Sequence, residues 1–266
     1  MVAENGLKAQ ERRTKPKKKN SKWPTWSVLL SIILLNRLYI KLDEYGTSVS
    51  LHYFETHVEP ASKKPIYKLS SIQPDNWLKI KEISPSLKRA ILLSEDDRFY
   101  KHSGFDFMQI KIALQDYIFD GKRLRGASTI SQQLAKNLYL SNDRNFFRKL
   151  LEMLIVFDIE SKASKDKIFE CYLNVIEYGE GIYGIKSAAQ HYFQKDASML
   201  STREGVFIAM LLPNPKVNSK SWDLKELTPF ASQFLRRTLT RLHQYGAISK
   251  GEYHASLQEK FHWERE

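Results

Sequence analysis

The chain has 266 residues, of which 42% are hydrophobic and 27% charged, and its formal net charge is +12. This composition can bury one substantial core, so it excludes a wholly disordered chain, and the length leaves no room for a second full enzyme domain. Half of the positive charge lies in residues 1–22, which contain eight Lys or Arg and two Glu and predict a basic cytoplasmic tail. The rest is spread thinly, which favours an anionic substrate or a membrane surface over nucleic acid.

Residues 23–40 follow this tail, and the centre of the segment, Val28 to Leu35, carries no charge. About 20 apolar residues cross a bilayer, so the segment predicts one N-terminal transmembrane helix. Basic flanks stay in the cytoplasm, which places the remainder of the chain outside it. A cleaved signal peptide is the main alternative, although Asn36 to Ile40 offers no small-residue cleavage site. A buried amphipathic helix is a further alternative.

The segment 41–80 combines a β-like stretch, Ser48 to Phe54, with three prolines. We interpret it as a membrane-proximal stalk or jaw region. From Ser84 onward the apolar spacing predicts a mainly α body, with a core over 81–225 and a helical extension over 226–266. Two apolar series predict helices: Phe107, Ile110, Leu114 and Ile118, and then Ile130, Leu134 and Leu138. Capping boxes are predicted for Thr129 with Gln132, Ser201 with Glu204 and Ser249 with Glu252, and N-caps at Ser164 and Thr228.

Two polar clusters precede the middle of the chain. Residues 95–106 bring together four acids, two bases and a histidine after an apolar helical run, although a solvated helix end is the alternative. Residues 121–133 form a glycine-flanked basic loop that runs into a helix N-terminus. Such a loop is a natural anion site, because free N–H groups, the helix dipole and Lys or Arg side chains act together. A flexible surface turn remains the alternative.

Two more clusters follow. Arg144, Arg148 and Glu152 recur every four residues, which places them on one helical face, as in an exposed ion-pair ladder or a binding site. Residues 167–174 precede a loop with three glycines among tyrosines, for which a structural role is the alternative. Cys171, the only cysteine, is predicted to be a small buried side chain, since it can form no intrachain disulfide.

In this order the clusters resemble the signature motifs of the peptidoglycan glycosyltransferases, family 51 of the carbohydrate-active enzymes. The matching patterns are E-D-x-x-F-x-x-H-x-G-x-D, G-x-S-T-I-[ST]-Q-Q, R-K-x-x-E and E-x-Y-L-N, and residues 200–215 resemble the closing motif. The resemblance covers roughly residues 60–225 and implies a bilobed, mainly helical, lysozyme-like glycosyltransferase fold with a small membrane-dipping jaw lobe. No transpeptidase motif follows, so a monofunctional enzyme is expected.

The resemblance also implies roles for motif residues. Glu95 is the expected general base and Glu152 the second catalytic carboxylate. Cationic candidates for diphosphate binding are Lys136, Arg144, Arg148 and Lys149, with hydrogen-bond donors from Ser128, Thr129, Gln132 and Gln133. The remaining substrate-binding candidates are Arg98, His102, Asp106, Glu170, Tyr172 and Asn174.

The implied reaction polymerises lipid II into lipid-linked glycan with inversion at MurNAc C1. A divalent cation, Mg²⁺ or Mn²⁺, would accompany the substrate diphosphate, with no protein metal cage and no organic cofactor. The expected location is the bacterial cytoplasmic (inner) membrane, as a single-pass protein with an extracytoplasmic catalytic domain, together with other cell-wall synthesis or division proteins. A lysozyme-like glycan hydrolase and a non-catalytic lipid II-binding scaffold are the alternatives.

Overall fold

A computed structural model describes residues 29, 30, 33, 36, 45, 47–50, 52–119, 121, 128–140 and 146–264. The basic tail, most of the segment 23–40, Arg144 and most of the basic loop 121–127 therefore lie outside the described residues. The chain divides into two units after Ile40. In the first unit Leu29, Leu30 and Ile33 are helical and about half exposed. Among the described residues, no helix combines the length and apolar character that a membrane crossing requires. The second unit, 41–266, contains everything that follows.

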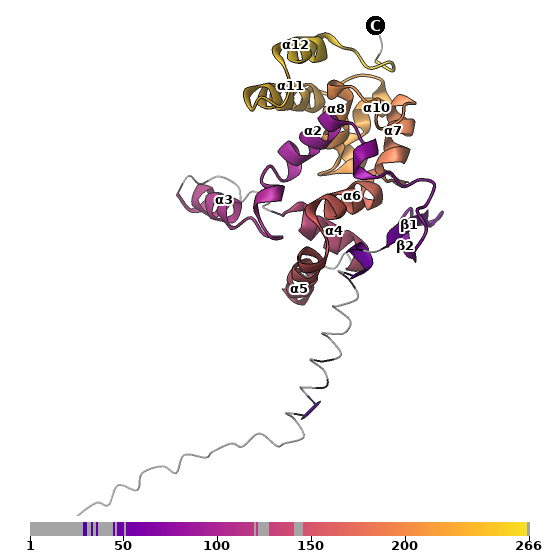
Figure 1. Ribbon diagram of the computed structural model, residues 1–266. Coiled ribbons are helices and arrows are strands. Elements are labelled where there is room, and N and C mark those ends of the chain that lie inside the picture. Colours follow the sequence, from indigo (N-terminus) through magenta and orange to yellow (C-terminus); the bar gives the residue numbers. More distant parts are fainter. Residues whose placement is uncertain are drawn as a thin grey trace, which may run out of the picture. The chain divides into compact units, whose positions relative to one another are not determined.

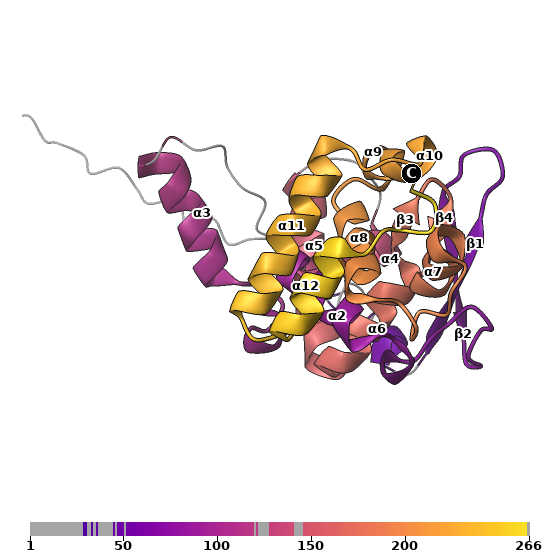
Figure 2. The same ribbon diagram turned by 90° about the horizontal axis from the view of Figure 1, so that it is seen from above.

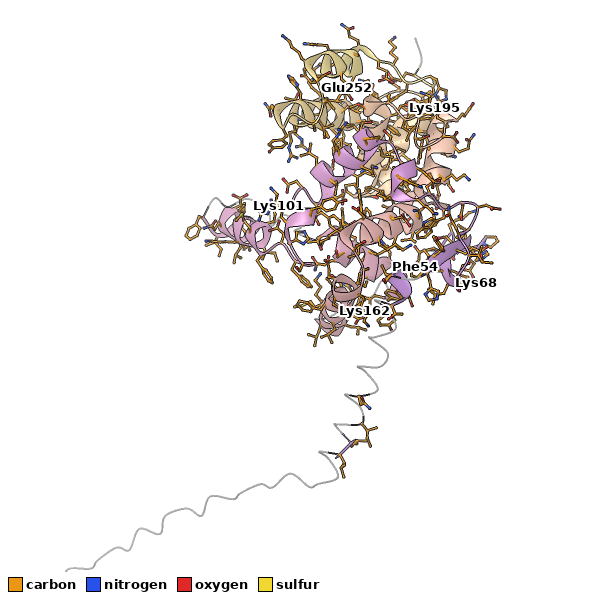
Figure 3. All side chains as sticks on the ribbon, viewed as in Figure 1. Phe54, Lys68, Lys101, Lys162, Lys195 and Glu252 are labelled. Carbon is orange, nitrogen blue, oxygen red and sulfur yellow. The ribbon has the colours of Figure 1, made fainter. Side chains whose placement is uncertain are left out.

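Its first extended element is a hairpin of two antiparallel strands, β1 (Tyr53–Val58) and β2 (Pro65–Ser70). Phe54 is directed towards the helices and is buried, whereas Lys68 lies on the outer side (Figure 3). The expected β-like stretch 48–54 is in part wrong, because residues 47–50 are helical and the strand begins only at Tyr53.

The centre of the core is α8 (Thr202–Leu211), in which all ten residues are buried. It packs most closely on α2 (Pro85–Glu95), and Gly205 makes this contact possible. A Cβ at Gly205 would lie 2.8 Å from the Cα of Leu87, closer than a side-chain carbon can approach backbone. The same glycine therefore fixes the position of α2, whose last residue is Glu95.

Three helices form the second packed group: α4 (Ile130–Tyr139), α5 (Phe146–Lys162) and α6 (Lys165–Val175). The predicted capping box of Thr129 with Gln132 is present, and the predicted N-cap Ser164 accepts from the Lys167 amide. Cys171 is fully buried in α6, and burial raises the pKa of its thiol to about 12, so the prediction of an unreactive core cysteine is confirmed.

The remaining elements complete the body. Short 3₁₀ turns η1 (Ile80–Glu82) and η2 (Phe99–Lys101) flank α2, and the hairpin β3 (Glu177–Gly179) and β4 (Ile182–Tyr183) leads into α7 (Ile185–Phe193). After α8 come α9 (Pro215–Asn218), α10 (Lys220–Leu224), α11 (Pro229–Gln244) and α12 (Lys250–Gln258). The predicted N-caps Ser201 and Thr228 are confirmed. At Ser249 only half of the expected box forms, because Glu252 bonds to Thr202 instead.

Helix α3 (Phe107–Phe119) differs from the others, because it projects away from the body in both views (Figures 1 and 2). The spacing predicted this helix correctly. Of its residues only Ala113 is buried, whereas Phe107 and Phe119 are more than 70% exposed. Its other exposed apolar side chains are Met108, Ile110, Ile112, Leu114, Tyr117 and Ile118. Helix α5 adds Leu150, Met153, Leu154 and Phe157, so the unit presents a wide apolar surface.

Candidate active site

The carboxylate of Glu95 ends helix α2 and faces α4. Gln133 Nε2 donates to Glu95 Oε2 at 2.8 Å, and the hydroxyl of Tyr172 donates to Gln133 Oε1 at 3.1 Å. Burial raises the pKa of Glu95, and the neighbouring Asp96 raises it further, whereas the hydrogen bond from Gln133 lowers it. A carboxylate that is desolvated but still hydrogen-bonded suits a general base.

Directly after Glu95, Asp96 connects α2 to α4. Its Oδ2 accepts from the backbone N–H of Ile130 at 3.0 Å, and His102 Nε2 lies 2.9 and 3.1 Å from its two oxygens. The carboxylate of Asp96 thus contacts both the first turn of α4 and the ring of His102. Asp96 and His102 therefore hold the start of α4 against the end of α2.

A second polar pair supports α3. Asp106 Oδ1 accepts from the backbone N–H groups of Met108 and Gln109, both at 3.0 Å, so Asp106 caps this helix. Its Oδ2 lies 3.0 Å from Nε of Arg98. The first motif therefore contributes one carboxylate that faces a cavity, Glu95, and a framework that holds three helix ends in place.

The second catalytic candidate, Glu152, is buried on α5. Its Oε2 accepts from Arg148 at 2.9 Å, and its Oε1 accepts from Lys149 and, at 3.3 Å, from Gln132 Nε2. The predicted spacing of Arg148 and Glu152 on one helical face is confirmed. Two cations are thus held around one carboxylate, and only one of the two, Lys149, has a side chain more than 40% exposed.

Residues of this region line two cavities. The smaller, of about 170 Å³, is lined by Glu95, Asp96, Asp106, Ser128, Thr129 and residues of α3 and α11. The larger, of about 970 Å³, is lined by Gln133, Lys136 and Tyr172, together with the β1–β2 turn and residues 212–216. Because Gln133 lines the large cavity and bonds to Glu95 in the small one, the carboxylate lies between the two.

Other expected binding residues are engaged inside the protein. Glu170 accepts from Trp77 Nε1 and from the Ile80 amide, both at 3.0 Å. Asn174 Oδ1 accepts from the Leu78 amide, and its Nδ2 donates to the Leu78 carbonyl, both at 2.8 Å. These two side chains secure the segment 77–80 and line neither cavity.

The structure also brings residues to the cavities that the sequence motifs did not indicate. Arg241 of α11 lines the small cavity, 3.8 Å from Asp97. Lys63, Lys64 and Lys216 line the large one with Lys136. These positions carry no local pattern, because they reach the site only through long-range packing. Their charge makes the large cavity suited to an anionic ligand.

Three acidic and histidine side chains among the described residues lie close together. The atoms of Asp96, His102 and Asp106 lie within 4.8 Å of one another. However, Asp96 and Asp106 already face His102, Arg98 and backbone N–H groups. Both oxygens of Glu152 are likewise occupied.

Comparison with known proteins identifies the family of this chain. Residues 62–239 match the transglycosylase family model. The chain is 38% identical over 201 residues to a biosynthetic peptidoglycan transglycosylase of Herminiimonas arsenicoxydans, covering 72% of this chain and 84% of the relative. It is 35% identical over 224 residues to the protein of that name from Nitrosospira multiformis, covering 83% and 94%. The Pasteurella multocida protein of that name is 46% identical over 161 residues, covering 59% and 65%.

The helical body thus holds a desolvated carboxylate, Glu95, and a second carboxylate among cations, Glu152, as an enzyme that transfers glycosyl groups requires. The chain belongs to the transglycosylase family.

Proposed function

We propose that this protein is a peptidoglycan glycosyltransferase of cell-wall synthesis that joins lipid II units into a lipid-linked glycan. The observation that carries the proposal is the position of Glu95, whose partly buried carboxylate lies between the two cavities and is oriented by Gln133. The family and the names of the relatives support the same chemistry.

In the proposed reaction Glu95 takes the proton of the GlcNAc 4-hydroxyl on the acceptor. The hydroxyl oxygen then forms a bond to C1 of the donor MurNAc from the face opposite the diphosphate. The bond from C1 to the phosphate oxygen breaks, and its electron pair leaves with the diphosphate, so the anomeric centre is inverted. The raised pKa of Glu95 favours this step, because a more basic carboxylate accepts the proton more readily.

The departing diphosphate needs positive charge. Lys136 is exposed and lines the large cavity. Arg148 and Lys149 lie on the neighbouring helix α5, where both contact Glu152. We assign these three to the diphosphate. Ser128 lines the small cavity, whereas the hydroxyl of Thr129 is engaged inside the protein and donates to the Gly104 carbonyl at 2.6 Å. Glu152 keeps the two α5 cations oriented, so its role is electrostatic.

We further propose that a divalent cation, Mg²⁺ or Mn²⁺, enters with the substrate diphosphate. We expect the diphosphate rather than a protein cage to hold it, because the carboxylates near the site have protein partners. The reaction steps above therefore use only this chain's own side chains.

The exposed apolar surface of α3 and α5 supports a location at a membrane. Side chains such as Phe107, Phe119 and Phe157 are more than half exposed, which is unfavourable in water and favourable in a lipid interface. Together with the sequence-based anchor at 23–40, this surface would keep the site beside its lipid-linked substrate. We propose the extracytoplasmic face of the bacterial inner membrane as the location.

The test is polymer formation by the purified full chain from radiolabelled lipid II. We expect glycan polymer from the native protein and none from Glu95→Gln, which keeps the shape of the side chain and removes the base. Glu160→Gln is the matched control. Glu160 is also a carboxylate that contacts α4, through Ser131, but it pairs with Lys165 away from the cavities.

Digestion of finished sacculi without polymer formation would identify a hydrolase instead. Binding of lipid II without turnover by the native protein would identify a scaffold. Unchanged polymerisation by Glu95→Gln would remove Glu95 from its role as base.

A further inference from the structure

The hydroxyl of Tyr172 has a single described side-chain partner, Gln133. Tyr172 is fully buried in α6, and its hydroxyl donates to Gln133 Oε1 at 3.1 Å. The other end of the same amide, Nε2, donates to Glu95 at 2.8 Å. Three helices are thus connected by one chain of two hydrogen bonds: α6, α4 and α2.

This arrangement determines which end of the Gln133 amide faces the carboxylate. An amide can turn over and exchange its oxygen and nitrogen, since the two ends have nearly the same shape. If Gln133 turned over, its oxygen would face the oxygens of Glu95, and the hydroxyl of Tyr172 would have to accept rather than donate. The tyrosine hydroxyl therefore favours the orientation in which Gln133 donates to Glu95.

We infer that Tyr172 is a positioning residue for glycosyl transfer, which acts through Gln133 to hold the amide donor on Glu95. The inference rests on the proposed role of Glu95 as base. Tyr172 need not touch the reacting atoms, and it remains a neutral donor because burial raises its pKa well above the ordinary value.

The consequence is a pH effect. A hydrogen bond to the charged carboxylate favours the ionised form, so loss of the donor makes Glu95 bind its proton more tightly. In Tyr172→Phe the Gln133 oxygen loses its partner and the amide is no longer held in one orientation. Glu95 should then be protonated up to a higher pH, and the acid limb of the pH–rate profile should move up.

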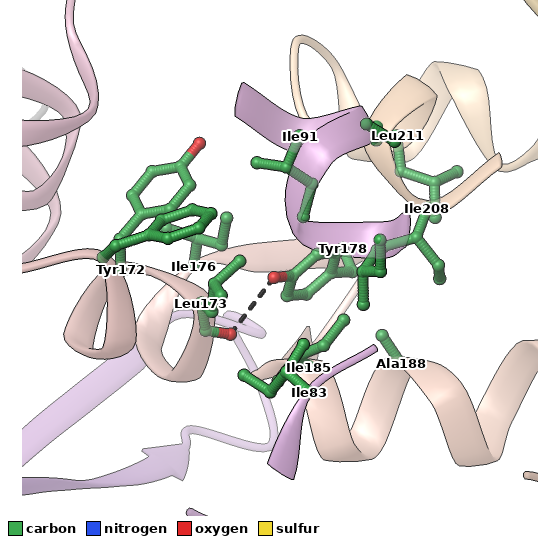
Figure 4. Close-up of a cluster of buried hydrophobic side chains, with 14 of the residues drawn as sticks. Ile83, Ile91, Tyr172, Leu173, Ile176, Tyr178, Ile185, Ala188, Ile208 and Leu211 are labelled. Atoms are coloured by element: carbon green, nitrogen blue, oxygen red, sulfur yellow. Dashed lines mark hydrogen bonds between the residues drawn. The ribbon is translucent and has the colours of Figure 1, made fainter. Parts of the chain in front are cut away.

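A matched control is available in Tyr178. It is also a fully buried tyrosine, and its hydroxyl donates to the Leu173 carbonyl at 3.1 Å. Figure 4 shows this bond within the apolar cluster, whereas the Tyr172 hydroxyl points away from the cluster. Tyr178→Phe therefore removes a comparable buried hydrogen bond with no connection to Glu95.

The experiment measures kcat and KM for lipid II polymerisation between pH 4 and 9 with the full chain. For Tyr172→Phe we expect the acid limb to rise by about 0.5 pH units or more, with a loss in kcat and little change in KM. Tyr178→Phe should leave the limb in place. Thermal melting of both variants reports any shared loss of stability.

A double-mutant comparison tests the route through Gln133. Gln133→Met should raise the limb by itself, and adding Tyr172→Phe to it should raise the limb no further, because the relay is already broken. An unmoved limb in Tyr172→Phe, or a full additional shift in the double variant, would overturn the inference.

Glu95→Gln in the same assay separates this result from the proposed function. If that variant is inactive and Tyr172→Phe shows no shift, only the relay is wrong. If Glu95→Gln remains fully active, Glu95 is not the base, and the inference about Tyr172 falls with that assignment.

Discussion

Glu95 and Glu152 are both hydrogen-bonded to α4, through two glutamines that are adjacent in the chain. Gln133 donates to Glu95 at 2.8 Å, and Gln132 donates to Glu152 at 3.3 Å. Neighbouring residues on a helix point about 100° apart, so the two carboxylates approach α4 from different sides. Helix α4 therefore fixes the distance between Glu95, the base, and Glu152, the carboxylate that pairs with Arg148 and Lys149.

The first prediction concerns the pH dependence of the native enzyme. Burial raises the pKa of Glu95 above its ordinary value of 4.5. Because the base works only when ionised, kcat/KM should fall as the pH drops through this raised pKa, and activity should be retained above it. Initial rates of lipid II polymerisation across pH 4–8 give the limb. A limb at or below pH 4.5 would contradict the assignment.

The second prediction concerns Glu152→Gln. The change removes the counter-charge that Arg148 and Lys149 share. We expect the free energy of unfolding to fall by about 1–3 kcal/mol. We expect kcat/KM to fall by roughly 100-fold or more, because the two cations are no longer oriented for the diphosphate. Denaturant unfolding and polymerisation rates measure the two effects. Equal activity at equal folded fraction would show that Glu152 is only structural.

The third prediction concerns the apolar surface of α3. Ile118→Asp places a charge on a side chain that is 59% exposed and has no role in the core. We expect kcat/KM for lipid II in vesicles to fall roughly 10-fold, since burial of this surface in lipid is lost. Turnover of a short-chain, water-soluble analogue should be unchanged.

The control for this surface is Phe230→Asp on α11, a site with a similar exposed fraction of 52%. This substitution should change neither kcat/KM for lipid II in vesicles nor turnover of the water-soluble analogue. Equal losses at the two positions would mean that α3 has no special contact with the membrane.

The fourth prediction separates structure from binding at Asn174. Asn174→Ala leaves the N–H and C=O of Leu78 without their partners. We expect the free energy of unfolding to fall by about 2–4 kcal/mol. KM for lipid II, measured on the folded fraction, should stay the same. A raised KM at unchanged stability would instead identify a substrate contact.

The fifth prediction uses the close packing of α8 on α2. Gly205→Ala must push these helices apart, so we expect a loss of about 1–3 kcal/mol or more in unfolding free energy. Gly251→Ala in α12 is the control, because its added Cβ would meet only Ser249 Oγ at 4.0 Å. That variant should be as stable as the native protein or more stable by up to ~1 kcal/mol. Equal losses in both would exclude the packing argument.

Helix positions and caps were well predicted from sequence, because their signals are local. The spacing of Ile130 and Leu134 and the capping box at Thr129 describe α4 correctly. The β1–β2 hairpin was not predicted, since in β1 only Phe54 is fully buried and the alternation of strand residues is correspondingly weak.

The site was predicted less completely, for a physical reason. Glu170 and Asn174 contact residues more than 90 positions earlier in the chain, so no local pattern shows that their polar groups are already used. Arg241 reaches the small cavity only because α11 packs on α2. On α3 the apolar spacing predicts a helix, but it cannot show whether protein or lipid covers the apolar side chains.

The first turn of α4 has a consequence for its exchange with solvent. Helices normally begin with N–H groups that lack partners. Here the amides of Thr129, Ile130 and Gln132 donate to Gln132, Asp96 and Thr129 side chains respectively. These amide protons should exchange for deuterium as slowly as those of a helix interior, so the turn that carries both glutamines should open only when the whole body unfolds.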